Sequence, residues 1–259
     1  FAPRNGRHGI LDDMTNFESW VADRNKFWAN PTGWLAIVGF HWLTSEPTAL
    51  PGIEGLWSAN DHTVTITDFE GQPEQVFEIA RGASVTLPWA KGQIEVASRN
   101  GSIVVRPRDK TADLLAGFKG IAHFDYSPAL KVEAEFTPAP VTADATNPDY
   151  EVAGHLSFNI DGQRHTLLAY KNNNPEQLYV IFRDSTSATE TAATGRNLTA
   201  TREGGQWFLD FNLAQNFPCA YSDFTTCPVP PAENVLPVSI AAGEKRPPFR
   251  VGPDGLRAQ

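Results

Sequence analysis

Short runs in which apolar and polar residues alternate dominate the first half of the chain. Between residues 62 and 136 they recur at intervals of roughly 8 to 12 residues, separated by breaks rich in Gly, Pro or Asp. The runs are HTVTITD, QVFEIA, ASVTLP, GQIEVAS, GSIVVRP and LKVEAEF. Because alternation places successive side chains on opposite faces of a sheet, this pattern predicts a series of antiparallel strands.

The N-terminal part has a helical period instead. In TNFESWVADRNKFW, residues 15–28, the aromatic side chains fall on one stripe of a helix, and Thr15 stands three residues before Glu18, as in a capping box. Pro31 and Gly33 are expected to end this helix. The apolar run GWLAIVGFHWL that follows is predicted to be a strand buried on both faces.

Two hairpins are predicted in the second half. Asp161-Gly162 lies between two alternating runs, in GHLSFNIDGQRHTLLAYK, and this dipeptide favours the tight turn in which both central residues adopt positive φ. Such a turn leaves one strand face polar and the other apolar except for His165, which we expect at the exposed rim. A second hairpin is predicted around Gly204-Gly205, after the buried strand QLYVIFRD.

These elements predict a mainly β protein: an antiparallel β-sandwich or barrel-like sheets, with one N-terminal amphipathic helix and an irregular Pro-rich C-terminal strap. TPAPVTADATNPD, residues 137–149, has the composition of a linker. We therefore expect a helix and arm at 1–33, a first β-rich lobe at 34–136, a second with the strap at 150–245, and a tail at 246–259. One continuous domain is the alternative.

The charge of the chain bears on its partners. With 21 basic and 30 acidic residues the formal net charge is -9, which repels phosphate backbones and anionic lipid surfaces, so we expect neither nucleic acid nor a membrane as a partner. No apolar run approaches the roughly 20 residues that a membrane-spanning helix needs. We expect a cytoplasmic location, although the chain begins with Phe1 and an export signal could have preceded it. The oligomeric state is left open.

Sequence motifs for catalysis or cofactor binding are not recognisable. The chain has no nucleophile elbow, phosphate-binding loop, dinucleotide fingerprint or zinc-protease motif, so we expect no cofactor and no metal. Cys219 and Cys227 enclose seven residues, a span that a turn could close as a disulfide but that does not match a zinc knuckle. We expect two unbonded, mostly buried thiols, with a disulfide or a metal site as the alternatives.

A distinctive series of motifs occupies the C-terminal half. DFN is followed by NFPCAYSDFTTCPVPPAEN and VLPVSIAAGEK, and is preceded by GWLAIVGFHWL, VVRPRD, GFKGIAHFDYSP, VIFRDSTS and GRNL. In this order the motifs resemble the bacterial and archaeal family known as domain of unknown function 1684, from about Phe17 to Lys245. The family name implies no activity. The chain departs from the family pattern at Phe217 and Tyr221, in NFPCAY where the family has NPPCAF. It has TAATGRN where the family has TYGGGRY.

The family positions present in this chain supply a candidate site. Asp210 and Asn212 lie on one face of the strand QWFLDFN, and both are poor strand formers that need hydrogen-bond partners when buried. In one interpretation they accept backbone N–H groups from the proline-rich segment. In the other, they line the mouth of a pocket with Arg196 and Asn216, and residues 213–245 form its wall.

Glu244 is expected to form an ion pair with Arg196 or Arg106, in a structural role. The candidate ligand-binding residues are therefore Arg106, Arg196, Asp210, Asn212, Asn216 and Glu244.

Three classes of function remain open. We favour the binding of a small polar or anionic metabolite in a β-sheet cavity. The alternatives are a hydrolase or isomerase that uses Asp210 with His155 or His41, and a structural or interaction protein without a ligand. Whether the chain is an enzyme, and which residues would be catalytic, is left open by the sequence.

Overall fold

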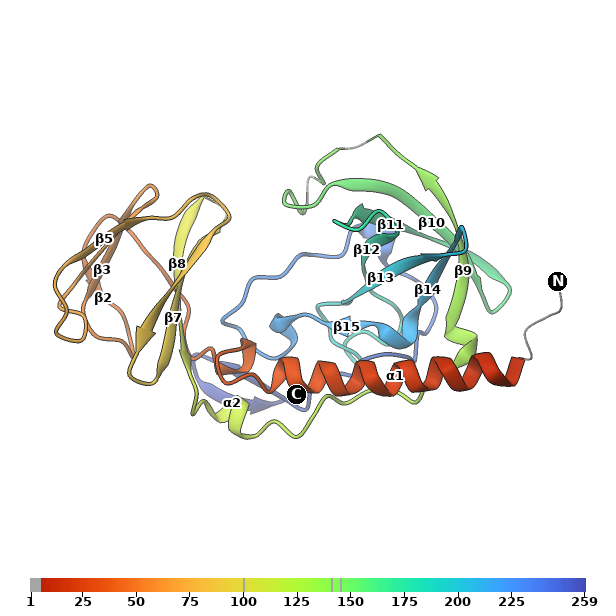
Figure 1. Cartoon of the computed structure of the whole chain (residues 1–259), viewed down its shortest axis with the longest axis horizontal. Coiled ribbons are helices and arrows are strands. Elements are labelled where there is room, and N and C mark those ends of the chain that lie inside the picture. The colour runs from red at the N-terminus through yellow and green to blue at the C-terminus, as the bar shows by residue number, and fades with distance from the viewer. Residues whose placement is uncertain (1–5, 100, 141, 145) are drawn as a thin grey trace.

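The computed structural model describes residues 6–99, 101–140, 142–144 and 146–259, with the side chains of the first helix from Asp13 onward. The fold is mainly β, which confirms the predicted class: antiparallel strands form two groups of sheets, and one long helix runs beside them (Figure 1). The helical elements are α1 (Gly6–Trp28), η1 (Trp34–Ala36), α2 (Asp113–Ala116), η2 (Pro128–Leu130), η3 (Phe211–Leu213), η4 (Pro218–Ala220) and η5 (Ala232–Asn234).

Helix α1 starts earlier than the sequence suggests. Thr15 lies inside it, so the expected N-terminus at Thr15 and Glu18 is wrong, whereas the end at Trp28 agrees with the breaks at Pro31 and Gly33. Phe17 and Trp28 are buried, as the aromatic stripe predicts. Figure 1 shows the helix running alongside the strands of residues 131–216 and ending near the strands of residues 41–109.

The first group, here called the N-terminal lobe, consists of two four-stranded sheets with the orders β2-β3-β4-β5 and β1-β8-β7-β6. Trp57 and Ile66 of one sheet pack with Ile94 and Val105 of the other in a common core, so the sheets face each other. The strands are β1 (His41–Trp42), β2 (Thr48–Ala49), β3 (Leu56–Asn60), β4 (Thr63–Thr67), β5 (Gln75–Glu78), β6 (Ser84–Trp89), β7 (Gly92–Arg99) and β8 (Ser102–Asp109).

The run GWLAIVGFHWL is not the buried strand that was predicted. Only His41 and Trp42 form a strand that pairs with β8; upstream, backbone pairing with β8 consists of an isolated bridge from Ile37 and a bond from Val38 N–H to the Pro107 carbonyl. Pro107 has no N–H to donate in return, which interrupts the ladder along this edge.

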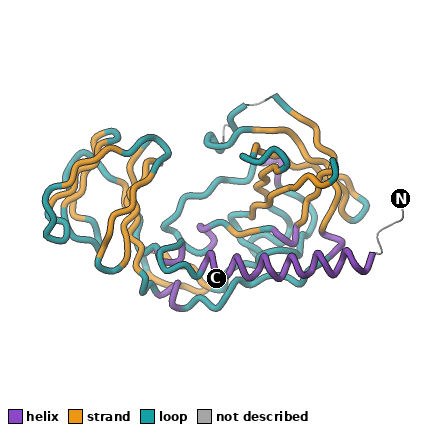
Figure 2. Tube along the Cα trace, in the orientation of Figure 1, coloured by secondary structure: helices purple, strands orange, loops and turns teal. Residues whose placement is uncertain are grey.

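The second group is a closed barrel of six antiparallel strands in the order β12-β11-β10-β9-β14-β13, with β13 pairing back to β12 and the short β15 added at β13. Apolar side chains from all six strands, among them Leu156, Leu167, Val180, Leu198 and Leu209, form its core. Figure 2 shows the barrel strands at one end of the molecule and the N-terminal lobe at the other. The strands are β9 (Lys131–Pro138), β10 (Val152–Ile160), β11 (Gln163–Lys171), β12 (Gln177–Phe182), β13 (Arg196–Glu203), β14 (Gln206–Asp210) and β15 (Gln215–Asn216).

Both predicted hairpins are present. Asp161 and Gly162 have φ of 52° and 74°, and the turn joins β10 to β11 in the expected register, which pairs Phe158 with His165. The expectation for His165 is wrong: the side chain is only 8 % exposed and its ring packs 5.8 Å from that of Phe158. Closure of the barrel turns this face of the sheet inward, which the sequence of one hairpin does not reveal.

Residues 137–149 do not separate the two groups of strands. They join β9 to β10 within the barrel, and Val152 N–H bonds back to the Thr142 carbonyl. β9 pairs with β10 and β14 and so belongs to the barrel, whereas the sequence analysis placed most of its residues in the first lobe. The chain passes from the first group of strands to the second in residues 110–130. The division into domains stays a prediction. Residues 246–259 contain a hairpin of β16 (Phe249–Gly252) and β17 (Gly255–Ala258).

Residues 211–245, here called the strap, are irregular as predicted and cover one end of the barrel. Leu236, Ile240 and Ala242 join the barrel core. Asn234 anchors the strap: its side chain accepts from Leu168 N–H over 2.7 Å and donates to the Leu168 and Ile181 carbonyls. These bonds supply partners to backbone groups of β11 and β12, two strands that pair with each other only at Tyr170–Tyr179 and Lys171–Leu178.

The prediction of two unbonded thiols is wrong. Cys219 and Cys227 form a disulfide, with their Cα atoms 6.2 Å apart. The loop between the cysteines turns at Ser222, whose hydroxyl accepts from Phe224 N–H and whose carbonyl accepts from the Thr225 hydroxyl, a geometry that the spacing alone left undecided.

Candidate functional site

A buried ion pair joins helix α1 to the end of the strap. Arg24 Nε donates to Glu244 Oε1 over 2.7 Å, and Asn216 N–H donates to Glu244 Oε2 over 2.8 Å. Glu244 is completely buried, and this burial raises the pKa of its carboxyl group against the opposing effect of Arg24. Asn216 is fixed in turn by a bond from its side-chain amide to the Lys245 carbonyl. We call Arg24, Asn216 and Glu244 the Glu244 cluster.

Arg196 is not the partner of Glu244 that the sequence suggested. Its guanidinium donates to Asp184 Oδ2 over 2.8 Å, to the Ile240 carbonyl over 2.9 Å, and to the Ala242 carbonyl. Asp184 also accepts from the backbone and hydroxyl of Thr186. Burial lowers the pKa of Arg196, and Asp184 opposes this effect. The pair therefore fastens the strap to the barrel.

Asp210 and Asn212 hold a turn through hydrogen bonds within the protein. The Asp210 carboxylate accepts from the backbone and side-chain amides of Asn212, and Asn212 exchanges two further bonds with the backbone of Ser127. Burial raises the pKa of Asp210, although its bonds from Asn212 act in the opposite direction. The predicted need for hydrogen-bond partners is confirmed. Tyr126 lies close enough for the charge of Asp210 to add to the effect of burial in raising its hydroxyl pKa.

Arg106 lies apart from the other predicted residues, in the N-terminal lobe. It is buried, donates to Glu95 over 2.7 Å and lies over the ring of Trp34. Arg108 donates to the other oxygen of Glu95 over 2.5 Å. Neither Arg106 nor Arg108 forms an ion pair with Glu244, so the second proposed partner of Glu244 is also wrong.

The two histidines considered as catalytic partners of Asp210 are not among its hydrogen-bond partners. His155 Nε2 lies 3.0 Å from Glu233 on the strap, at an exposed position. His41 belongs to β1 of the N-terminal lobe, and burial lowers its pKa. The structure thus does not assemble a carboxylate and a histidine at Asp210 for acid–base chemistry.

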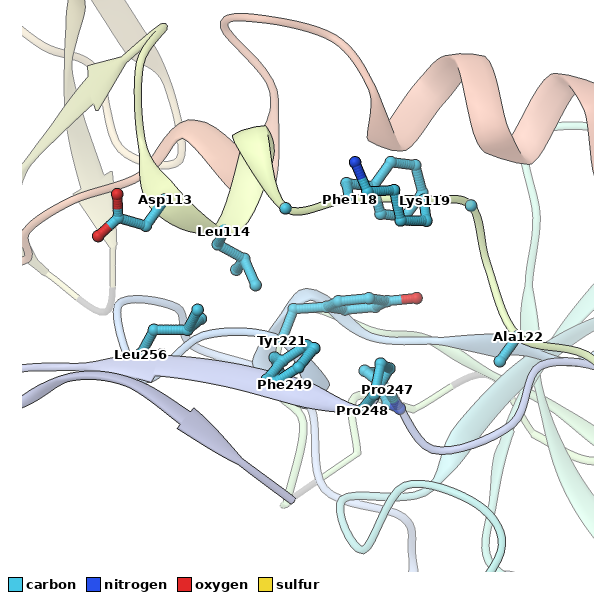
Figure 3. A pocket seen from close by; sticks show the side chains of 12 residues that line it. Asp113, Leu114, Phe118, Lys119, Ala122, Tyr221, Pro247, Pro248, Phe249 and Leu256 are labelled. Carbon is cyan, nitrogen blue, oxygen red and sulfur yellow. The ribbon is translucent and has the colours of Figure 1, made fainter.

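A cavity of about 120 Å³ lies next to the Glu244 cluster. Figure 3 shows the ring of Tyr221 between residues 113–122 on one side and residues 247–256 on the other. Most of the lining is apolar, with Asp113 and Lys119 as its charged members. The lining residues are Asp113, Leu114, Gly117, Phe118, Lys119, Gly120, Ala122, Tyr221, Pro247, Pro248, Phe249 and Leu256.

Tyr221 connects this cavity to the Glu244 cluster. Its ring packs on Trp28 with the ring centres 4.2 Å apart, which fixes it at the end of α1. Burial raises the pKa of its hydroxyl, and the charge of Glu244 adds to this effect. The hydroxyl also forms a hydrogen bond with the Asn216 side chain, which opposes this rise. A polar group thus lies beside an apolar wall, an arrangement suited to binding a small molecule.

Only part of this site was predicted from the sequence. Asn216 and Glu244 were candidates and lie together beside the Tyr221 cavity, but none of the six candidate residues is part of its lining. Arg24, Tyr221 and Asp184 were missed. The one signal for Arg24 was a charged residue on the apolar stripe of the N-terminal helix.

The described residues contain neither a metal-binding cluster nor a membrane-spanning helix. In the part of the chain that the structure describes, no cluster of three or more His, Cys, Asp or Glu side chains is arranged to hold a metal ion. No helix within the described ranges is both long and apolar enough to span a membrane.

Fold and site together define a mainly β protein with a closed barrel, a strap fixed by buried polar residues, and a small apolar cavity beside them. Residues 116–245, about half of the chain, match the family described as "Protein of unknown function (DUF1684)", and the chain belongs to that family. The match begins downstream of the first two motifs in the family resemblance, GWLAIVGFHWL and VVRPRD.

A solved structure is also similar to part of the chain. It is the solution NMR structure of an uncharacterized protein of Haloarcula marismortui, from gene locus rrnAC0354. The two sequences are 33% identical over 50% of this chain and 78% of that chain, with a TM-score of 0.43. A search of curated proteins found no match.

Proposed function

We propose that the chain binds a small molecule with a compact apolar body in the cavity at Tyr221. The observation that carries this proposal is the position of the cavity, which is apolar but bounded by a tyrosine that touches the buried Glu244 cluster. Small-molecule sites combine a mostly apolar lining with a few fixed polar groups. The Tyr221 cavity has both features.

The size of the cavity limits the ligand. An apolar protein cavity of roughly 150 Å³ is known to hold benzene. At about 120 Å³, the Tyr221 cavity suits a body no larger than one aromatic ring. Phe249 and Leu256, exposed at 47% and 44%, belong to its lining and supply apolar surface that ligand binding would bury.

The proposal changes the ligand favoured from sequence. A polar or anionic metabolite was expected at Arg196 and the Asp210–Asn212 face, but these groups are occupied by bonds within the protein. The polar contact now assigned to the ligand is the Tyr221 hydroxyl. A phenol-like molecule, with one ring and one hydroxyl group, is the simplest compound that meets both requirements.

Titration with phenol, followed by NMR shifts and by thermal melting, tests this proposal. We expect saturable binding and a higher melting temperature, because a ligand that binds only the folded state stabilises it. Ala122→Phe places a ring in the cavity and should weaken binding at least about tenfold. Ala116→Phe, at an exposed alanine outside the lining, is the matched control. Phenol binding that is absent, or equal in both variants, would contradict the proposal.

A further inference from the structure

A second concave region lies between the N-terminal lobe and the barrel. Two neighbouring cavities of about 310 and 600 Å³ share Arg99, Pro148 and Asp149 in their linings. One wall belongs to turns of the N-terminal lobe, and the other to residues 146–150 of the barrel. We call this region the interlobe cleft. It has no lining residue in common with the Tyr221 cavity.

The wall on the lobe side carries two arginines, Arg81 and Arg99, of which Arg99 is held in place. Arg99 Nη1 donates to the Gly82 carbonyl over 3.1 Å and to the Ser98 carbonyl over 2.7 Å, which ties the turn before β6 to the end of β7. Arg81 precedes Gly82 in this turn and forms no hydrogen bond or ion pair with the described residues. Its guanidinium is available to a ligand.

The opposite wall is also held in place. Asn147 is buried and exchanges two bonds of 2.9 Å with the backbone of Val229 on the strap. The ring of Tyr150 stacks on that of Tyr179, with the ring centres 5.6 Å apart. Asp149 stands between these two anchored residues and lines both cavities, so its backbone is positioned before any ligand arrives.

The charges of the two walls are complementary but do not meet. Within the described ranges, Asp149 forms no ion pair, whereas Arg99 forms one with Glu95 of its own lobe, at 3.8 Å. A cleft lined by two arginines and one carboxylate that form no salt bridge with one another matches a molecule that carries both charges. Clefts between lobes are frequent ligand sites, and their walls concentrate the field of such groups.

We propose that the interlobe cleft binds a free α-amino acid. The carboxylate of the amino acid pairs with Arg81 and Arg99, because a planar guanidinium matches the geometry of a carboxylate. The ammonium group of the amino acid pairs with Asp149. Thr146, Thr226 and the polar backbone around them favour a short or polar side chain over a large apolar one.

The experiment is a thermal-melting screen of the full-length protein against each of the twenty common L-amino acids, followed by calorimetric titration of the best binders. The decisive comparison is between an amino acid and the two compounds that each lack one of its charges. For L-serine these are 3-hydroxypropanoate and ethanolamine. We expect both to bind at least about tenfold more weakly than the amino acid, since each loses a charge-assisted hydrogen bond. An absence of saturable binding by all twenty would overturn the proposal, as would a parent amino acid that binds no more tightly than the compounds lacking one charge.

Variants locate the binding site. Arg81→Gln and Asp149→Asn should each weaken amino-acid binding about tenfold or more. Arg164→Gln and Asp125→Asn, exposed and outside the cleft lining, are the matched controls and should bind as the parent does. Ala122→Phe should also leave binding unchanged, which separates this proposal from that for the Tyr221 cavity. Binding that survives both cleft variants would place the amino acid elsewhere and overturn the proposal.

Discussion

Arg24 and Glu244 stand 220 residues apart in the sequence, yet their side chains form a hydrogen-bonded ion pair of 2.7 Å. Arg24 comes from the first helix and Glu244 from the end of the strap. The contact therefore joins a segment that precedes the barrel strands in the sequence to one that follows them. Glu244 is fully buried and needs a compensating charge there. The Tyr221 cavity lies beside this pair, so the integrity of the pair bears on the shape of the site.

Arg24→Met should therefore destabilise the protein strongly, by about 3–5 kcal/mol, because it leaves the Glu244 carboxylate buried without its partner. The double variant Arg24→Met/Glu244→Gln should recover part of this loss by removing the unpaired charge. Urea unfolding at neutral pH measures both, and Lys26→Met, which removes an exposed pair with Asp23 on the same helix, is the control. A double variant less stable than Arg24→Met would contradict the assignment of the cost to an unpaired charge.

Asp210 should give the stability of the protein a specific pH dependence. Its pKa is raised in the folded state by burial, so the folded state favours the protonated form. The contribution of Asp210 to the free energy of unfolding is then fully present below its unfolded pKa and is lost as pH rises through the folded pKa. Asp210→Asn removes this titration while keeping an acceptor for the Asn212 amides.

The free energy of unfolding of the parent, relative to Asp210→Asn, should therefore fall between acidic and neutral pH. Unfolding curves at several pH values provide the measurement, with Glu74→Gln as a control at an exposed carboxylate. A difference that rises with pH would show that the bonds from Asn212 outweigh burial. Asp210→Ala, which removes the acceptor as well as the titration, should cost about 1–3 kcal/mol, with a smaller cost at neutral than at acidic pH.

The sequence predicted the structure correctly where interactions between residues close in the chain determine it. Alternating runs became strands, Asp161-Gly162 became a tight turn, and the proline-rich strap stayed irregular. His165 was misplaced because barrel closure, a property of all six strands, decides which face is buried.

The candidate site shows the same limit. Asn216 and Glu244 were found because they stand among distinctive motifs, but their partner was not, since nothing near Arg24 in the sequence points to a residue at the other end of the chain. Arg196 was recognised as important but given the wrong partner, because Asp184 and Glu244 are equally plausible acids until the path of the strap is known.

The disulfide between Cys219 and Cys227 yields a sharp chemical test. The protein unfolded without reductant should show no free thiol, and two after reduction, because the described residues include no unbonded cysteine. Two thiols before reduction would contradict the disulfide. Since disulfides are rare in the reducing cytosol, the count obtained from protein isolated with its thiols blocked also tests the cytoplasmic location expected from the sequence.

The disulfide should also stabilise the fold. Closing so short a loop removes chain entropy from the unfolded state equivalent to about 2–3 kcal/mol, and the prolines of the strap, which already restrict that state, should place the measured value at the lower end. The variant Cys219→Ala/Cys227→Ala, compared with the parent by urea unfolding, measures this loss. Reductant is the internal control: it should lower the midpoint of the parent toward that of the variant and leave the variant unchanged. If reductant leaves the urea midpoint of the parent unchanged, the disulfide does not stabilise the fold, and the strap is held by the bonds of Asn234 and Arg196.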